Sequence, residues 1–167
     1  MNSPIVSICC VTYNQVAYIR EAINGFLNQK TDFPYEICLG EDGSTDGTAE
    51  ICKEYAKNYP DKIRLFLRDR KDVIYINGQA TGRYNFLETL KECSGKYIAI
   101  CEGDDYWTDP YKLQKQVEWL ENYPDYAIST HNVSLKNENN AVNYVNKNRS
   151  VLEEDIHISS IIEYGSP

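Results

Sequence analysis

The sequence contains no long uninterrupted apolar segment and no basic stretch interleaved with aromatic residues. The first absence predicts that the chain does not span a membrane, and the N-terminus also shows no secretion signal. Acidic residues outnumber basic ones by 25 to 17, and this net charge of −8 argues against nucleic acid as a partner. We therefore expect a cytoplasmic protein, and leave open a peripheral place at the inner membrane face for the full-length protein.

Motifs for several common sites are also missing. No GxGxxG or Walker-type phosphate loop occurs, which argues against a dinucleotide site and a P-loop. The two histidines, His131 and His157, lack metal-ligand spacing, although His131 follows an expected strand and could border a sugar. The six cysteines do not form a disulfide framework, so we expect buried thiols in a reducing compartment.

Apolar runs typical of strands alternate with helical periodicity along most of the chain. Strands are predicted at 5–11, 35–40, 63–67, 97–101 and 127–130, and helices at 19–27, 84–93, from Pro110 onward and before Pro60, the last capped by Ser44 or Thr45. This alternation predicts a single α/β domain over 1–167, with a doubly wound, mainly parallel, Rossmann-like sheet and helices on both faces. Residues 135–150 interrupt the pattern and are expected to form a surface excursion with a short strand at 142–145; a terminal helix is expected at 156–164.

Three carboxylates follow the predicted strand at 97–101. Glu102, Asp104 and Asp105 would stand at the carboxyl edge of the sheet, where open α/β sheets bind their ligands. Like charges packed this closely repel each other unless a cation or a hydrogen-bonding ligand lies among them, and carboxylate oxygens suit Mg²⁺ or Mn²⁺. The alternative is a solvated acidic loop that caps the next helix through Asp109 and Pro110.

Two further strand ends carry polar residues. Tyr13 stands among small polar groups after the first strand and suits a flat heterocycle, or else simply packs a loop. After the second strand, residues 40–48 combine turn-forming glycines with carboxylates that can accept hydrogen bonds from a base or a ribose. A calcium loop beginning at Asp42 is the competing interpretation; Lys53 at its twelfth position and the strand before it argue against that interpretation.

Four segments in this order, 6–14, 41–48, 95–98 and 102–105, resemble the N-terminal half of inverting family-two glycosyltransferases, and the resemblance covers residues 4–132. It implies a GT-A fold and a nucleotide-sugar donor. By resemblance, Tyr13 stacks on the base and Asp42 accepts a hydrogen bond from it, which favours UDP over a purine nucleotide. The implied donor site comprises Val11, Thr12, Tyr13, Asn14, Glu41, Asp42, Arg83, Glu102 and Asp104, with Asp104 and Asp105 as ligands of Mn or Mg.

The sequence departs from the family pattern at several positions. Glu41 replaces a more usual Asp, and Glu102 replaces the first Asp of the DxD motif. Arg83-Tyr84-Asn85 only approximates the Ala-Arg-Asn element, so Arg83 is either a phosphate contact or an ordinary helix-start residue. The run 107–113 resembles bacterial members that build surface polysaccharides.

The resemblance implies inverting transfer of a sugar, with UDP-sugar as the favoured donor, to a glycan or lipid-linked glycan acceptor. Because the family's general base follows the DxD region at a distance, we expect it beyond Pro167, in which case the chain is a C-terminally truncated donor domain that is itself inactive. The alternatives are a nucleotide-binding module without transferase activity and a nucleotidyltransferase. The segment 12–17 has neither the glycine nor the basic residue expected of a nucleotidyltransferase. A homo-oligomer is left open.

Overall fold

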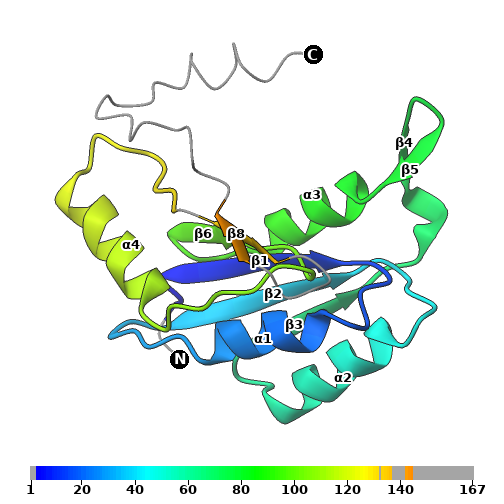
Figure 1. The fold of residues 1–167 in the computed structure, drawn as a ribbon, viewed down its shortest axis with the longest axis horizontal. Helices are drawn as coiled ribbons and strands as arrows, with labels where there is room; N and C mark the ends of the chain where they lie inside the picture. Colours follow the sequence, from blue (N-terminus) through cyan, green and yellow to red (C-terminus); the bar gives the residue numbers. More distant parts are fainter. Residues whose placement is uncertain (1–2, 132, 137–141, 145–167) are drawn as a thin grey trace. The chain divides into compact units, whose positions relative to one another are not determined.

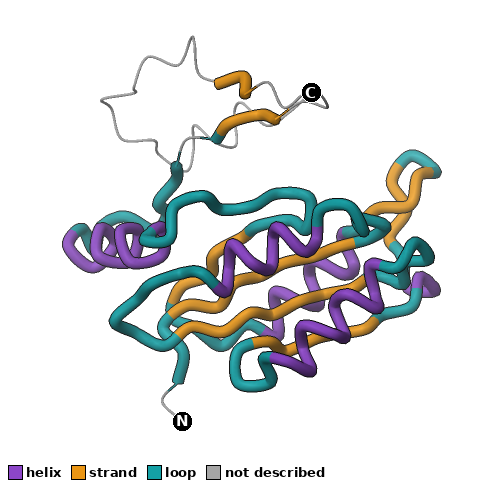
Figure 2. Tube along the Cα trace, turned by 60° about the horizontal axis from the view of Figure 1, so that its bottom comes forward, coloured by secondary structure: helices purple, strands orange, loops and turns teal. Residues whose placement is uncertain are grey.

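The computed structural model describes residues 3–131, 133–136 and 142–144. It divides into two compact units, Met1–Ile128 and Ser129–Pro167. A sheet of four parallel strands forms the centre of the first unit, in the order β3-β2-β1-β6 (Figures 1 and 2). The strands are β1 (Val6–Thr12), β2 (Tyr35–Glu41), β3 (Ile63–Leu67) and β6 (Tyr97–Ile100). The predicted parallel sheet and its first four strands are therefore confirmed.

Helices cover both faces of this sheet, as predicted (Figure 1). They are α1 (Ile19–Leu27), α2 (Thr48–Asn58), α3 (Arg83–Glu92) and α4 (Lys112–Asn122). Strand side chains alternate between the two faces, and Ile8 and Ile37 pack with Ile23 and Phe26 of α1 in the apolar core. The face that α3 covers is more polar, because α3 buries Asn85 and Thr89 against β1 and β2.

A hairpin that the sequence analysis did not predict joins β3 to α3. It follows the short 3-10 helix η1 (Arg70–Asp72) and pairs β4 (Ile74–Ile76) with β5 (Gln79–Thr81). Asn77 and Gly78 at its tip both have positive φ, the conformation of the tight turns that fit hairpin twist. The hairpin stands out from the sheet in Figure 1. Its second strand, β5, leads directly to Gly82 and Arg83 of the candidate site described below.

The second unit contains an antiparallel pair of short strands, β7 (Ser134–Lys136) and β8 (Val142–Tyr144). The strand expected around 142–145 is therefore confirmed. The helix expected at 156–164, His157 and most of the 135–150 excursion lie outside the described residues. Within the part of the chain that the structure describes, no helix is long and apolar enough to cross a membrane.

Two local predictions were wrong. Residues 127–130 form no strand: Ile128 is 57% exposed, and among the described residues β6 pairs with β1 alone. Helix α2 starts at Thr48, after Gly47 with φ 103°, and neither Ser44 nor Thr45 caps it. Instead, the Asp46 carboxylate accepts a 3.0 Å hydrogen bond from the Thr48 backbone N–H. The sequence did not reveal that the Ser44 hydroxyl would instead accept a hydrogen bond from the backbone N–H of Asn14, in the loop after β1.

The cysteines occupy the positions expected of buried thiols. All six are free, and five of them are buried, with only Cys93 partly exposed. Burial raises the pKa of the Cys52 and Cys101 thiols to about 12, which keeps both protonated and unreactive near neutral pH.

Candidate functional site

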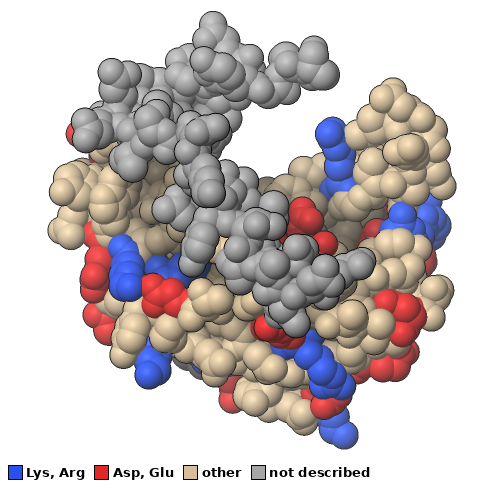
Figure 3. Space-filling model, viewed as in Figure 1, with Lys and Arg blue, Asp and Glu red and all other residues tan. Residues whose placement is uncertain are grey.

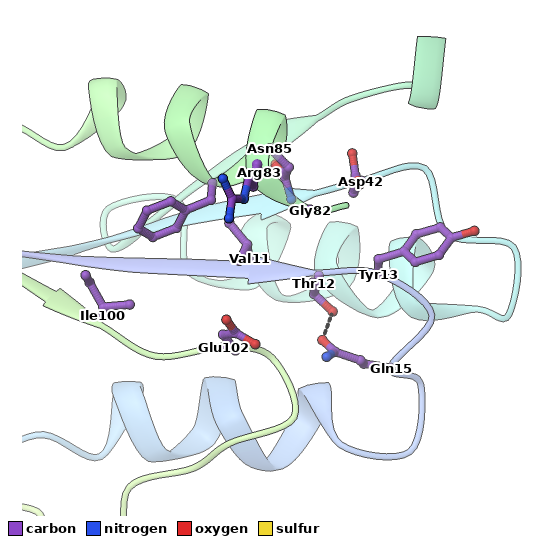
Figure 4. A pocket seen from close by; sticks show the side chains of 11 residues that line it. Val11, Thr12, Tyr13, Gln15, Asp42, Gly82, Arg83, Asn85, Ile100 and Glu102 are labelled. Atoms are coloured by element: carbon purple, nitrogen blue, oxygen red, sulfur yellow. Dashed lines mark hydrogen bonds between the residues drawn. The ribbon is translucent and has the colours of Figure 1, made fainter. Parts of the chain in front are cut away.

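A cavity of about 450 Å³ opens at the carboxyl ends of β1, β2 and β6 (Figure 4). This is the edge at which open parallel sheets bind ligands. Residues from four separate segments line it: Val11, Thr12, Tyr13, Gln15, Asp42, Gly82, Arg83, Asn85, Phe86, Ile100 and Glu102. The fold thus brings together the three strand ends that the sequence analysis selected.

The end of β1 supplies an aromatic ring and a hydrogen-bonded turn. Tyr13 is 40% exposed, and its ring centroid lies 3.9 Å from the guanidinium carbon of Arg70. The Thr12 hydroxyl donates a 2.8 Å hydrogen bond to Gln15 Oε1 (Figure 4). The Tyr13 ring is therefore a partly exposed, flat apolar surface in the cavity wall.

Asn14 joins the loop after β1 to the loop after β2. It has a left-handed conformation with φ 50°, which asparagine tolerates better than most residues. Its backbone N–H donates to Ser44 Oγ at 2.9 Å, and its Oδ1 accepts from the Thr45 N–H at 2.9 Å. Asn14 does not line the cavity, and its contacts fix the two loops that do.

Glu41 holds the turn after β2. Its carboxylate is buried and accepts hydrogen bonds from the backbone N–H groups of Gly43 at 3.2 Å and Ser44 at 2.7 Å. Gly43 has φ 72°, a conformation that glycine adopts without steric cost. Both Glu41 oxygens are thus bound by its own loop, and Glu41 is not part of the cavity lining.

Asp42 is the most unusual group in the site. The residue is only 2% exposed, and its Oδ2 accepts a 2.6 Å hydrogen bond from Arg70 Nη1 in an ion pair. The other oxygen, Oδ1, is buried without a hydrogen-bond partner among the described residues. Burial raises the pKa of the Asp42 carboxyl and Glu41 adds to the rise, while Arg70 and Arg68 oppose it. An unpaired buried oxygen is costly, which suggests that a ligand donor completes it.

Helix α3 forms the wall that faces the end of β1. Arg83, at the first position of the helix, is exposed and reaches towards Val11 (Figure 4). Phe86 lines the cavity one turn further along, and Asn85 is buried beneath them. The helix therefore offers one cationic and one aromatic side chain to a ligand.

The loop after β6 carries the acidic residues. Glu102 lines the cavity, and the Gly103 N–H donates a 3.0 Å hydrogen bond to the Val11 carbonyl oxygen. A Cβ at Gly103 would lie 2.8 Å from Thr12 Cβ, so only glycine lets this loop lie against β1. The space-filling view shows acidic and basic side chains exposed around the hollow beside the hairpin (Figure 3).

Asp104 and Asp105 are exposed on the same loop and are not part of the cavity lining. No group of three His, Cys, Asp or Glu residues among the described residues has the geometry of a metal site. Mg²⁺ and Mn²⁺ commonly take only one or two protein carboxylates and complete their shell with phosphates and water. The oxygen donors of this loop fit such an ion.

The structure also identifies residues that the sequence analysis missed. Gln15, Phe86 and Ile100 line the cavity, and Arg70 contacts two residues that do. Arg70 stands next to an unpredicted hairpin, and no local motif pointed to it. Its only sequence signal is its position just after a strand of the sheet.

Comparison with known proteins gives a consistent result. The profile of the family described as Glycosyl transferase family 2 matches residues 7–157. The chain is 43% identical to an uncharacterized protein of Mycobacterium tuberculosis, over 81% of the chain and 37% of that protein. It is 36% identical to EpsE of Bacillus subtilis, a proposed glycosyltransferase, over 77% of the chain and 43% of EpsE. The chain thus spans less than half of these relatives.

Two solved structures share the fold. TarS of S. aureus in complex with UDP matches with a TM-score of 0.55 and 23% identity, over 71% of this chain and 32% of TarS residues 1–349. A mannosyltransferase from Pyrobaculum calidifontis in complex with GDP-Man and Mn²⁺ matches with a TM-score of 0.56 and 24% identity, over 72% of this chain and 33% of that one. At this level of identity the likeness shows the GT-A fold alone.

Proposed function

The chain belongs to glycosyl transferase family 2, and from this membership we propose that its cavity binds the nucleotide of a sugar donor. The observation that carries the proposal is the pairing of Tyr13 and Asp42 in one cavity. The exposed Tyr13 ring offers a stacking surface, and the buried Asp42 Oδ1 has no hydrogen-bond partner among the described residues.

This pairing fits a pyrimidine base. The ring of a base stacks on an aromatic face, and a base N–H supplies the donor that Asp42 Oδ1 needs. Uracil and thymine carry an N–H between two carbonyl groups, so a single carboxylate oxygen can accept a hydrogen bond from it. We therefore assign a uridine or thymidine diphosphate sugar as the donor, with UDP-sugar favoured.

The remaining lining residues suit the ribose and the diphosphate. Arg83 offers a guanidinium, whose planar fork matches phosphate oxygens. Glu102 lines the cavity near the end of β1 and can accept hydrogen bonds from ribose hydroxyls. Asp104 and Asp105 would hold a divalent ion, which neutralises charge on the diphosphate leaving group when bound.

The proposed reaction is transfer of the sugar to a glycan or lipid-linked glycan acceptor in surface polysaccharide synthesis. Its support is the family and the names of relatives, which include TuaG, a proposed teichuronic acid biosynthesis glycosyltransferase of Bacillus subtilis that is 29% identical over 70% of this chain. An acceptor hydroxyl that attacks in line, opposite the leaving diphosphate, inverts the anomeric centre. We assign the general base of this step to none of the described residues.

Calorimetric titration with UDP, TDP and GDP, each with Mn²⁺, tests the donor assignment. We expect UDP and TDP to bind more tightly than GDP, because the site offers an acceptor matched to the pyrimidine N–H. Tighter binding of GDP would refute the pyrimidine assignment. If none of the three nucleotides bound, the donor-site proposal as a whole would be wrong.

A further inference from the structure

Arg70 does not line the cavity, yet it contacts two residues that do. Its Nη1 donates to Asp42 Oδ2 at 2.6 Å, and its guanidinium carbon lies 3.9 Å from the centroid of the Tyr13 ring. The Arg70 side chain is only 25% exposed. A single guanidinium therefore holds the only aromatic ring at the end of β1 and the buried carboxylate at the end of β2.

This contact decides which surfaces remain available to a ligand. Because Arg70 engages Oδ2, Asp42 has Oδ1 left for a donor. The guanidinium lies over one face of the Tyr13 ring, which stays 40% exposed, so a base that stacks on this ring would use the face that Arg70 does not cover. A planar, delocalised guanidinium makes both contacts at once, whereas an ammonium group acts as a single charged point.

We propose that Arg70 is a positioning residue, which orients the Tyr13 ring and the Asp42 carboxylate for the base of the donor without itself lining the cavity. The inference rests on the proposed nucleotide site and adds to it a residue that holds two side chains of that site in place.

The charged groups around Asp42 give this role a pH signature. Asp42 faces Arg70 and Arg68, which follow β3, and Glu41, the last residue of β2. Arg83 and Glu102 line the same cavity. Burial raises the pKa of Asp42, and Arg70 is the stronger of the two cations that oppose the rise. Removal of Arg70 therefore raises that pKa further. Protonated Asp42 is an uncharged and therefore weaker acceptor, so a variant without Arg70 should lose UDP affinity at a higher pH than the wild type.

The test compares Arg70→Gln, Arg70→Lys and wild type by calorimetry with UDP and Mn²⁺ between about pH 5.5 and 8. For Arg70→Gln we expect about tenfold weaker UDP binding at pH 8, the loss typical of a hydrogen bond to a charged group. The ratio of its Kd to the wild-type Kd should grow as the pH falls. Arg70→Lys keeps the charge, so we expect a smaller loss and a nearly wild-type pH profile. Titration of UDP itself affects both proteins equally at a given pH, so it does not change the ratio of the two Kd values.

Arg20→Gln is the matched control. Arg20 makes the same kind of contact away from the cavity, with a 2.8 Å ion pair to Glu54 and its guanidinium carbon 5.8 Å from the Tyr55 ring centroid. We expect a change in UDP affinity of less than about twofold for this variant, since exposed ion pairs contribute little. Binding of inorganic pyrophosphate with Mn²⁺ should be unchanged in Arg70→Gln, because pyrophosphate has no base and Arg70 orients only the residues that contact the base. Thermal unfolding confirms that each variant is folded.

An Arg70→Gln affinity equal to wild type, or a loss that is the same at every pH, would overturn the positioning role. A parallel loss of pyrophosphate affinity would also overturn it. Failure of the wild type to bind UDP would instead overturn the proposed function together with this inference, so the two failures are distinguishable.

Discussion

The side-chain amide of Asn85 donates a 2.9 Å hydrogen bond to the carbonyl oxygen of Gly40, which joins α3 to β2 directly beside the cavity. Asn85 Oδ1 in turn accepts from Arg68 Nη1 at 2.9 Å and from the Thr89 hydroxyl at 3.3 Å. Asn85 and Thr89 are buried, so this network replaces the apolar contacts that usually attach a helix to a sheet. It fixes the position of the helix that carries Arg83.

Gly40→Ala should disturb this attachment. A Cβ at Gly40 would lie 2.1 Å from Thr89 Oγ1 and 2.5 Å from Asn85 Oδ1, so these buried side chains, or α3 with them, must shift and break the network. We expect the free energy of unfolding in urea to fall by about 1–3 kcal/mol, the usual cost of overpacking. Gly82→Ala is the control for stability, because a Cβ there meets nothing within 4 Å. Equal stability of the two variants would show that the network tolerates the extra methyl group.

Tyr13 variants separate stacking from hydrogen bonding. Tyr13→Phe keeps the ring, and we expect its UDP affinity to stay close to wild type. Tyr13→Ala removes the stacking surface and should weaken UDP binding by about 1–3 kcal/mol, the usual value for a base on an aromatic ring. Calorimetry measures both. A large loss in Tyr13→Phe would show that the phenol hydroxyl, and not the ring, makes the contact.

The parts of this fold that local patterns control were predictable. Apolar runs separated by segments with helical periodicity located β1, β2, β3 and β6. The central strands β1 and β2 are buried on both faces and largely apolar, whereas β3 and β6 at the sheet edges keep several residues exposed. The expected parallel direction of these strands then placed Tyr13, Asp42 and Glu102 at one edge, where the structure finds them in one cavity. The resemblance to a known family supplied their roles, which the structure alone does not test.

The rest depended on tertiary contacts that no local pattern reveals. The roles of Asn14 and Glu41 in joining and holding loops arise because β1 and β2 are neighbours. Ile128 lies in a run with β propensity that has no pairing strand among the described residues. Arg70 acquires its contacts only because the chain turns back towards the cavity after β3. Each of these results depends on a partner distant in sequence.

Glu36 should make stability depend on pH in the acid range. Burial alone would raise its pKa, but hydrogen bonds from Ser7, Ser94 and Arg64 outweigh burial, so the pKa is lowered from its ordinary value of 4.5. A carboxyl whose pKa is lower in the folded state binds protons more readily when unfolded. Its stabilising contribution is therefore complete above pH 4.5 and is lost as the pH falls through the folded-state pKa.

Glu36→Gln tests this contribution. We expect the variant to be less stable than wild type by about 1–3 kcal/mol at pH 7, in the range for hydrogen bonds to charged groups. The difference should shrink below pH 4.5, as urea unfolding at several pH values would show. Glu50→Gln is the control, since Glu50 is 72% exposed in a 3.9 Å ion pair. A difference that does not change with pH would mean that the Glu36 charge contributes nothing.

The acidic loop after β6 offers a direct test of metal binding. If Asp105 helps to hold the ion that contacts the diphosphate, Asp105→Asn should weaken UDP binding by about 1–3 kcal/mol in Mn²⁺ and much less in EDTA. Asp61→Asn is the control, because Asp61 precedes β3 and so lies at the opposite edge of the sheet. An equal loss of affinity in both conditions would assign Asp105 to the nucleotide or to the loop, whose Asp105 N–H donates to the Glu102 carbonyl oxygen at 3.1 Å. The metal role of the loop would then depend on Asp104 alone, and Asp104→Asn measured in the same two conditions decides that case.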